Sequence, residues 1–171
     1  MNAGRMRRHA YTLVEVLVTV TVLSIAAALV IPSSGQTDVL RVQAGVRSIV
    51  SDLTTAQSDA LAFQRGRAVK FYPNQRRYRL LEVRGTTLDE NLDMLDETQF
   101  VGNDFGDSVV TGGFFSFPNT IIFDEMGSPV DTPAGTSAAP NQWIDIAGSR
   151  QTYRITVEAY TGRVTVTNTT P

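Results

Sequence analysis

The chain is apolar from Tyr11 to Ile31 except for one charged side chain, the carboxylate of Glu15. A helix of this length rises about 1.5 Å per residue and spans roughly the 30 Å hydrocarbon core of a bilayer. Valine and threonine favour strands in water, but lipid requires every backbone N–H and C=O group to be paired within the segment, as a helix does. The sequence therefore predicts a membrane-spanning helix over residues 11–31.

Basic residues flank this segment on one side only. Arg5, Arg7 and Arg8 precede it, and the next Lys or Arg in the chain is Arg41. Lys and Arg close to a membrane-spanning helix are concentrated on its cytoplasmic side. We therefore expect residues 1–10 in the cytoplasm and the remainder of the chain outside.

Glu15 is costly within an apolar segment, because an ionised group near the centre of a spanning helix costs about 2.5–3.5 kcal/mol. One explanation is local: Thr12 and Glu15 fit a capping box, with the carboxylate facing the positive end of the helix dipole. A second explanation is a positive charge supplied by another subunit after proteolysis. The two explanations are compatible.

The residues around Glu15 resemble the class III signal of type IV prepilins and type II secretion pseudopilins. A basic leader is followed by the small residue Ala10, the aromatic Tyr11, and an apolar run that closes at Pro32. In that family a prepilin peptidase cuts on the cytoplasmic side of the apolar segment and methylates the new amino terminus. The resemblance implies cleavage between Ala10 and Tyr11, N-methylation of Tyr11 and an assembly role for Glu15. The family prefers Gly before the cut and most often Phe after it, so this chain departs from the pattern at both positions.

An ordinary secretory signal peptide is the alternative at this end of the chain. Small residues at Ser33 and Gly35 would permit cleavage before Gln36. The apolar run is longer than the usual 7–15 residues of such a signal, and Glu15 would weaken it. The first amino acid of the mature chain separates the two hypotheses, because one predicts Tyr11 and the other Gln36.

Pro32 and Gly35 predict a hinge after the apolar segment, because proline removes a backbone donor and glycine loosens the chain. An amphipathic helix is expected next, stacked on the first and ending near Gly66 in a left-handed cap conformation. We favour packing of its apolar stripe on the chain's own sheet over a coiled-coil seam with another chain, although both could apply along different parts of the helix. Its apolar residues recur at spacings of three and four: Val39, Val42, Val46, Ile49, Leu53, Ala56, Ala60 and Phe63.

From Ala68 onward, short apolar runs separated by turn residues predict antiparallel strands. The clearest alternation runs over residues 152–159, and the turn at 160–163 leads into a last strand over 164–169. The other expected strands are 68–72 and 77–83, joined as a hairpin by 73–76, then 120–123, which leads into the turn at 124–129, and 142–147.

Two segments predict irregular structure. Residues 131–141 are rich in Thr, Pro, Ala, Gly and Ser, which is typical of a loop. Residues 84–98 are acidic, and we favour a solvated loop or short helix there over a calcium site, because the spacing is not that of an EF-hand loop. The acidic side chains are Asp89, Glu90, Asp93, Asp96 and Glu97.

The strand and turn order at 122–129, 143–146, 153–157 and 161–164 resembles the C-terminal region of the GspH/FimT pseudopilin family. With the N-terminal signal, this resemblance extends over nearly the whole chain from Arg8. It implies a minor subunit of a pilus-like fibre in the bacterial inner membrane, used in type II secretion or in a type IV pilus. In that plan the N-terminal helix packs with other subunits and the C-terminal domain is periplasmic.

The sequence offers no catalytic constellation. His9 is the single histidine and lies in the expected leader, and the chain has no cysteine, so a mature Ser-His-Asp triad, thiol catalysis and the usual zinc sites are excluded. Asp124 and Glu125 could supply paired carboxylates, but adjacent side chains on a turn usually point apart. No cofactor and no metal are expected.

Nucleic acid is not expected as a partner, although some FimT relatives bind it. The formal net charge is −2, and an acidic protein does not attract a polyanion. The arginines that could do so are Arg163 and a cluster near one hairpin, namely Arg76, Arg77, Arg79 and Arg84 around Tyr78.

These observations predict an α+β, pilin-like fold, with a long N-terminal helix packed against an antiparallel β-sheet domain. The expected organisation is a cleaved leader (1–10), a membrane-spanning half-helix (11–31), a hinge and amphipathic half-helix (32–66) and a β-rich domain (67–171). We expect a non-enzymatic pseudopilin, with other pilin subunits, the prepilin peptidase, the inner-membrane assembly platform and membrane lipid as partners. The alternatives are a minor pilin for DNA uptake or adhesion, and a secreted β-domain.

Overall fold

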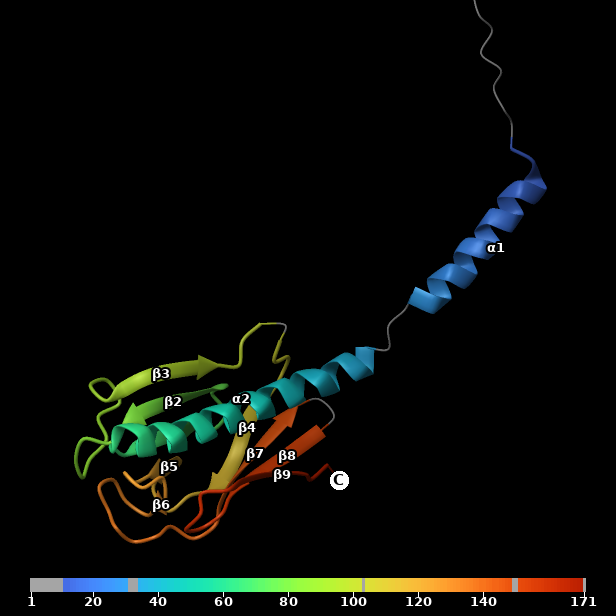
Figure 1. Ribbon diagram of the computed structural model, residues 1–171. Helices are drawn as coiled ribbons and strands as arrows, with labels where there is room; N and C mark the ends of the chain where they lie inside the picture. Colours follow the sequence, from blue (N-terminus) through green and yellow to red (C-terminus); the bar gives the residue numbers. More distant parts are fainter. Residues whose placement is uncertain (1–10, 31–33, 103, 149–150, 171) are drawn as a thin grey trace, which may run out of the picture. The chain divides into compact units, whose positions relative to one another are not determined.

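The computed structural model describes residues 11–30, 34–102, 104–148 and 151–170 (Figure 1). It divides into two compact units, Met1–Ser34 and Gly35–Pro171, which are considered separately. The first contains helix α1 (Leu13–Val30), and the second contains helix α2 (Ser34–Phe63) from its second residue onward and continues into β-strands. The expected stacking of the two helical segments stays a prediction.

The second unit contains two antiparallel sheets. The five-stranded sheet has the order β3-β2-β1-β5-β6, and the four-stranded sheet the order β4-β7-β8-β9. The bounds in the first sheet are Met94–Gln99 (β3), Arg77–Glu82 (β2), Arg67–Tyr72 (β1), Thr120–Phe123 (β5) and Pro129–Val130 (β6). Those in the second are Val109–Phe114 (β4), Gln142–Gly148 (β7), Gln151–Val157 (β8) and Val164–Asn168 (β9).

Helix α2 packs its apolar stripe against both sheets. The stripe is buried from Val42 to Ala60 and shares one core with residues of each sheet, for example Phe71 and Ile155. A smaller cluster that contains Ile122 and Leu81 packs separately from this core. The predicted α+β fold, a helix packed on antiparallel sheet, is therefore confirmed.

The C-terminal end of α2 differs from the prediction. The left-handed residue is Gln64 (φ 49°), and the Arg65 N–H donates to Ala60 O at 3.3 Å, as in a Schellman motif. Gly66 is needed for close packing instead, because a Cβ there would lie 2.9 Å from the Cβ of Val83. Phe63, expected in the stripe, is 62% exposed because the stripe ends one turn earlier.

The predicted strand segments are confirmed, with small shifts at their ends. Three strands lie where none was expected. β4 and the two-residue β6 were not assigned, and β3 occupies the end of the acidic segment that we expected to be irregular. β3 forms because its backbone pairs with β2 and its Glu97 faces Arg77 and Arg79, contacts that no local pattern reveals.

Candidate functional site

Thr12 caps the first turn of α1. Its Oγ1 accepts a hydrogen bond from the Glu15 N–H at 3.2 Å, and its backbone O accepts one from the Val16 N–H at 3.2 Å. This is the Thr12 half of the predicted capping box. Within the described residues, the Glu15 carboxylate has neither a hydrogen-bond nor an ion-pair partner. The capping box therefore accounts for the backbone N–H group of Glu15, and among the described residues it supplies no partner for the carboxylate.

The hydroxyl groups of α1 are paired inside the helix. Thr19 Oγ1 donates to Val16 O at 2.8 Å, Thr21 Oγ1 to Leu17 O at 2.7 Å, and Ser24 Oγ to Val20 O at 2.7 Å. Such bonds to the preceding turn remove polar groups from the helix surface. The surface that remains is apolar and exposed, with Leu13 at 81% and Leu23 at 66%.

No helix in the described part of the chain combines the length and the apolar character needed to cross a membrane. The predicted span over residues 11–31 is therefore not confirmed. α1 has 18 residues, which at about 1.5 Å per residue is a little shorter than the hydrocarbon core.

The other predicted processing and hinge residues have different outcomes. Ala10 and Pro32 lie outside the described residues. Tyr11 precedes α1 and is 77% exposed. Gly35 lies in the first turn of α2, which begins at Ser34. The hinge at Pro32 and Gly35 stays a prediction.

The basic hairpin is neutralised by carboxylates. Arg79 Nε lies 2.6 Å from Glu97 Oε2, and Arg77 Nη1 lies 3.3 Å from the same oxygen. The guanidinium groups of Arg77 and Arg79 also lie over the ring of Tyr72, at 4.5 and 5.6 Å from its centroid. A hydrogen bond from Gln99, with the nearby Arg79, lowers the pKa of Glu97. These arginines are therefore poorly placed to bind a polyanion.

The rest of the cluster is also engaged. Arg76 donates to the backbone O of Gly106 and Ser108. Tyr78 points to the opposite face of the sheet, where its hydroxyl lies 2.5 Å from Asp52 Oδ2. Burial and this hydrogen bond raise the pKa of Tyr78. The sequence suggested a basic surface with an interleaved aromatic ring, whereas Tyr78 belongs to the core.

Carboxylates of the acidic segment form ion pairs and hydrogen bonds with other side chains of the same domain. Glu90 Oε1 lies 2.5 Å from Lys70 Nζ, and Glu90 also accepts a hydrogen bond from the Tyr72 hydroxyl. The bond from Lys70 lowers the pKa of Glu90, while burial and Glu90 raise the pKa of Tyr72 to about 12. Asp93 Oδ1 lies 3.6 Å from Arg84 Nε. In the described ranges, no group of three or more His, Cys, Asp or Glu side chains could hold a metal ion.

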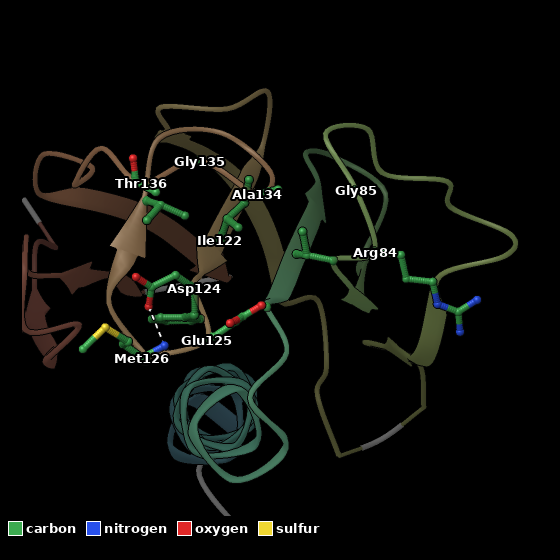
Figure 2. A pocket seen from close by; sticks show the side chains of 13 residues that line it. Arg84, Gly85, Ile122, Asp124, Glu125, Met126, Ala134, Gly135 and Thr136 are labelled. Atoms are coloured by element: carbon green, nitrogen blue, oxygen red, sulfur yellow. Dashed lines mark hydrogen bonds between the residues drawn. The ribbon is translucent and has the colours of Figure 1, made fainter.

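Asp124 and Glu125 border a pocket of about 530 Å³ between the β5–β6 turn and the 134–136 loop (Figure 2). Asp124 Oδ1 accepts hydrogen bonds from the backbone N–H groups of Met126 and Ser128 at 2.9 and 2.8 Å, so it shapes the turn. Glu125 is exposed, and Figure 2 shows Arg84 with its guanidinium group directed away from it. One oxygen of the Asp124 carboxylate thus belongs to the turn, and the Glu125 carboxylate lies in solvent.

Sequence reasoning missed Gln57. Its amide Nε2 donates to Gly127 O at 2.8 Å and to Thr161 O at 2.9 Å, which ties α2 to a turn of each sheet. The sequence signal available was its position directly after Ala56 of the apolar stripe.

An apolar, internally hydrogen-bonded N-terminal helix that carries one carboxylate, followed by a helix packed on antiparallel sheet, is the architecture of a pilin-like protein. Residues 5–31 match the family model described as the prokaryotic N-terminal methylation motif. The fold is similar to that of the minor pseudopilin EpsH from the type 2 secretion system of Vibrio cholerae, with a TM-score of 0.51 and 13% sequence identity over 75% of this chain and 96% of that chain. No curated protein sequence matches the chain. The motif and the fold together support the recognition of a type IV pilin-like protein.

Proposed function

We propose that the chain is a non-enzymatic minor pseudopilin of a type II secretion system, assembled with other pilin-like subunits into a short fibre. The methylation motif at residues 5–31 supports the pilin-like part of this proposal, and the likeness to EpsH favours a secretion pseudopilus over a type IV pilus. Engagement of Arg77 and Arg79 by Glu97 argues against a role in DNA uptake.

In this proposal the prepilin peptidase cleaves between Ala10 and Tyr11 and methylates the Tyr11 amine. Residues 11–31 then anchor the chain as a single pass in the bacterial inner membrane, with the C-terminal domain in the periplasm. The arginines before Tyr11, the exposed apolar side chains of α1 and its internally paired hydroxyl groups support this placement.

The observation that carries the assembly step is the Glu15 carboxylate, which has no partner in the described residues. An uncompensated carboxylate in an apolar environment favours an arriving cation. The Tyr11 amine of the next subunit supplies that cation, and their attraction at low dielectric sets the register of the two helices. A fibre extended in this way takes its energy from a separate ATPase.

Replacing Glu15 tests this step. Glu15→Gln should leave the chain folded and membrane-associated but reduce its incorporation into sheared or cross-linked fibres at least tenfold. Glu125→Gln is the matched control, because it removes an exposed carboxylate from the folded domain. Normal incorporation of Glu15→Gln would refute the proposed mechanism.

The mature amino terminus provides a second test. Mass spectrometry of the purified chain should find N-methyltyrosine at position 11. A chain that starts at Gln36 and is recovered from the medium would establish the secreted-domain alternative instead.

A further inference from the structure

Strand β9 leaves one edge of the four-stranded sheet open. The Glu158 N–H donates to Arg163 O and the Thr169 N–H to Thr152 O, at the two ends of the β8–β9 pairing. Because hydrogen-bonded residues alternate along an antiparallel pair, the odd-numbered residues of β9 form the backbone hydrogen bonds to β8. The backbone groups of Val164, Val166 and Asn168 therefore point outward, and they have no partner among the described residues. β9 has neither a Lys nor a Pro, the residues that usually protect an edge from pairing with another strand.

An apolar groove lies beside this open edge, between β9 and helix α2. Its volume is about 450 Å³, and Val46, Val50, Tyr153 and Val166 supply its apolar lining. Val166 pairs with the fully buried Ile155 and so points to the side of the sheet that faces α2, yet it is 43% exposed. A further strand added to β9 would place every second side chain over this groove.

Arg47 gives the groove a charge. It lines the groove from α2 and is exposed, and within the described residues it has no ion pair and no hydrogen-bonded partner. The arginines of the β1–β2 hairpin, by contrast, each face a carboxylate or a backbone oxygen. The groove is thus complementary to an apolar segment that also carries a negative charge.

We propose that β9 receives an extended segment of a neighbouring fibre subunit by β-strand addition. Backbone hydrogen bonds to Val164, Val166 and Asn168 hold the segment, its alternate apolar side chains fill the groove, and an acidic side chain on the same face pairs with Arg47. A second copy of β9 is a poorer occupant, because its sequence from Val164 to Asn168 contains no carboxylate. The identity of this occupant as a fibre subunit rests on the proposed function above.

The first test is binding of a synthetic peptide to the detergent-solubilised full chain, followed by NMR. The probe is acetyl-Thr-Val-Thr-Val-Thr-Glu-Thr-amide, and the matched control has Lys in place of Glu. We expect saturable shifts of β9 and of Val46 and Val50 with the Glu peptide, and about tenfold weaker binding of the Lys peptide. Equal binding of the two peptides, or no binding at millimolar concentration, would overturn the proposal.

Two variants separate the contribution of the β9 backbone hydrogen bonds to peptide binding from the contribution of the Arg47 charge. Val166→Pro removes an N–H group that faces outward and leaves the pairing of β9 with β8 intact, so it should weaken binding about tenfold. Arg47→Glu should reverse the preference in favour of the Lys peptide. Because Arg47 is an exposed residue of α2, this variant tests the proposal even if the proline variant does not fold. Ser58→Glu, on the exposed side of α2, should change neither the affinity for the Glu peptide nor the preference for Glu over Lys. Unaltered binding in both test variants would refute strand addition at β9.

The occupant is tested in cells with Val166→Cys, which introduces the sole cysteine of the chain. A benzophenone attached to this thiol should cross-link to another pilin-like subunit, identified by mass spectrometry. Cross-links to a second copy of this chain, or to a protein outside the fibre, would overturn the proposed occupant. The Glu15 and amino-terminal experiments fail or succeed independently of peptide binding, so they test the proposed function separately.

Discussion

Gln57 joins helix α2 to both sheets through a single amide group. Its Nε2 donates to Gly127 O in the β5–β6 turn and to Thr161 O in the β8–β9 turn, at 2.8 and 2.9 Å. Gly162 packs so close to this amide that a Cβ there would collide with it. We therefore expect Gln57 to fix the positions of both turns on the helix.

The cost of removing the amide follows from these two bonds. A net intramolecular hydrogen bond contributes about 1 kcal/mol, so Gln57→Ala should lower the free energy of unfolding by about 2 kcal/mol. For a domain of this size that corresponds to a fall in melting temperature of roughly 5–8 °C. Gln57→Glu keeps the shape but replaces the donor by a carboxylate facing two carbonyl oxygens, and should cost at least as much at neutral pH.

Acidification should partly rescue the Gln57→Glu variant. The two carbonyl groups favour the protonated carboxyl, so its pKa in the folded chain is raised above that of the unfolded chain. Relative to wild type at the same pH, stability should therefore be lost as pH rises through the folded pKa and regained as pH falls.

Chemical denaturation of the detergent-solubilised full chain, followed by far-ultraviolet circular dichroism, measures these differences. Ser58→Ala on the exposed side of α2 is the control and should stay within about 0.5 kcal/mol of wild type. A Gln57→Glu variant as stable as wild type at pH 7 would refute the assigned role of the amide.

Three further predictions concern packing and pH. Leu53→Ala should cost about 2–5 kcal/mol in denaturation experiments, because the side chain is fully buried between helix and sheets; a loss below about 1 kcal/mol would contradict that packing. Gly66→Ala should cost about 1–3 kcal/mol, since the added Cβ would lie 2.9 Å from the Cβ of Val83, and an unchanged denaturation midpoint would count against it. The pKa of Tyr72 is raised by burial and Glu90 from 10.0 to about 12, so stability should fall as pH rises from 10 toward 12. Tyr72→Phe should reduce this alkaline loss, and an identical pH dependence in wild type and variant would disprove the assignment.

Local patterns predicted much of the second unit correctly. The stripe from Val42 to Ala60 follows helical spacing, and the alternation that includes Ile155 and Val157 follows strand spacing. Both depend on neighbours within a few residues, which sequence periodicity reports directly. The β1–β2 hairpin was predicted for the same reason, from two short strands joined by turn residues.

Of the candidate sites, the sequence predicted those formed by neighbouring residues and missed those formed by distant segments. Thr12 and Glu15 were found together because a cap is a local arrangement. The ion pairs of the basic cluster had no local sequence signal, because Glu97, which neutralises Arg77 and Arg79, lies on another strand. The groove beside β9 had no sequence signal, because it is formed by residues of α2, β8 and β9 that are distant along the chain.

The sequence by itself determined the apolar N-terminal helix, its cap, its one carboxylate and the helical stripe, because these depend on residue type and short-range spacing. Only the tertiary structure decided that Gln64 and not Gly66 ends α2, that β3 is a strand, and that β9 is left with an open edge. The physical reason is that strand pairing and ion pairing join distant segments, and their free energy depends on which groups the whole fold brings within contact.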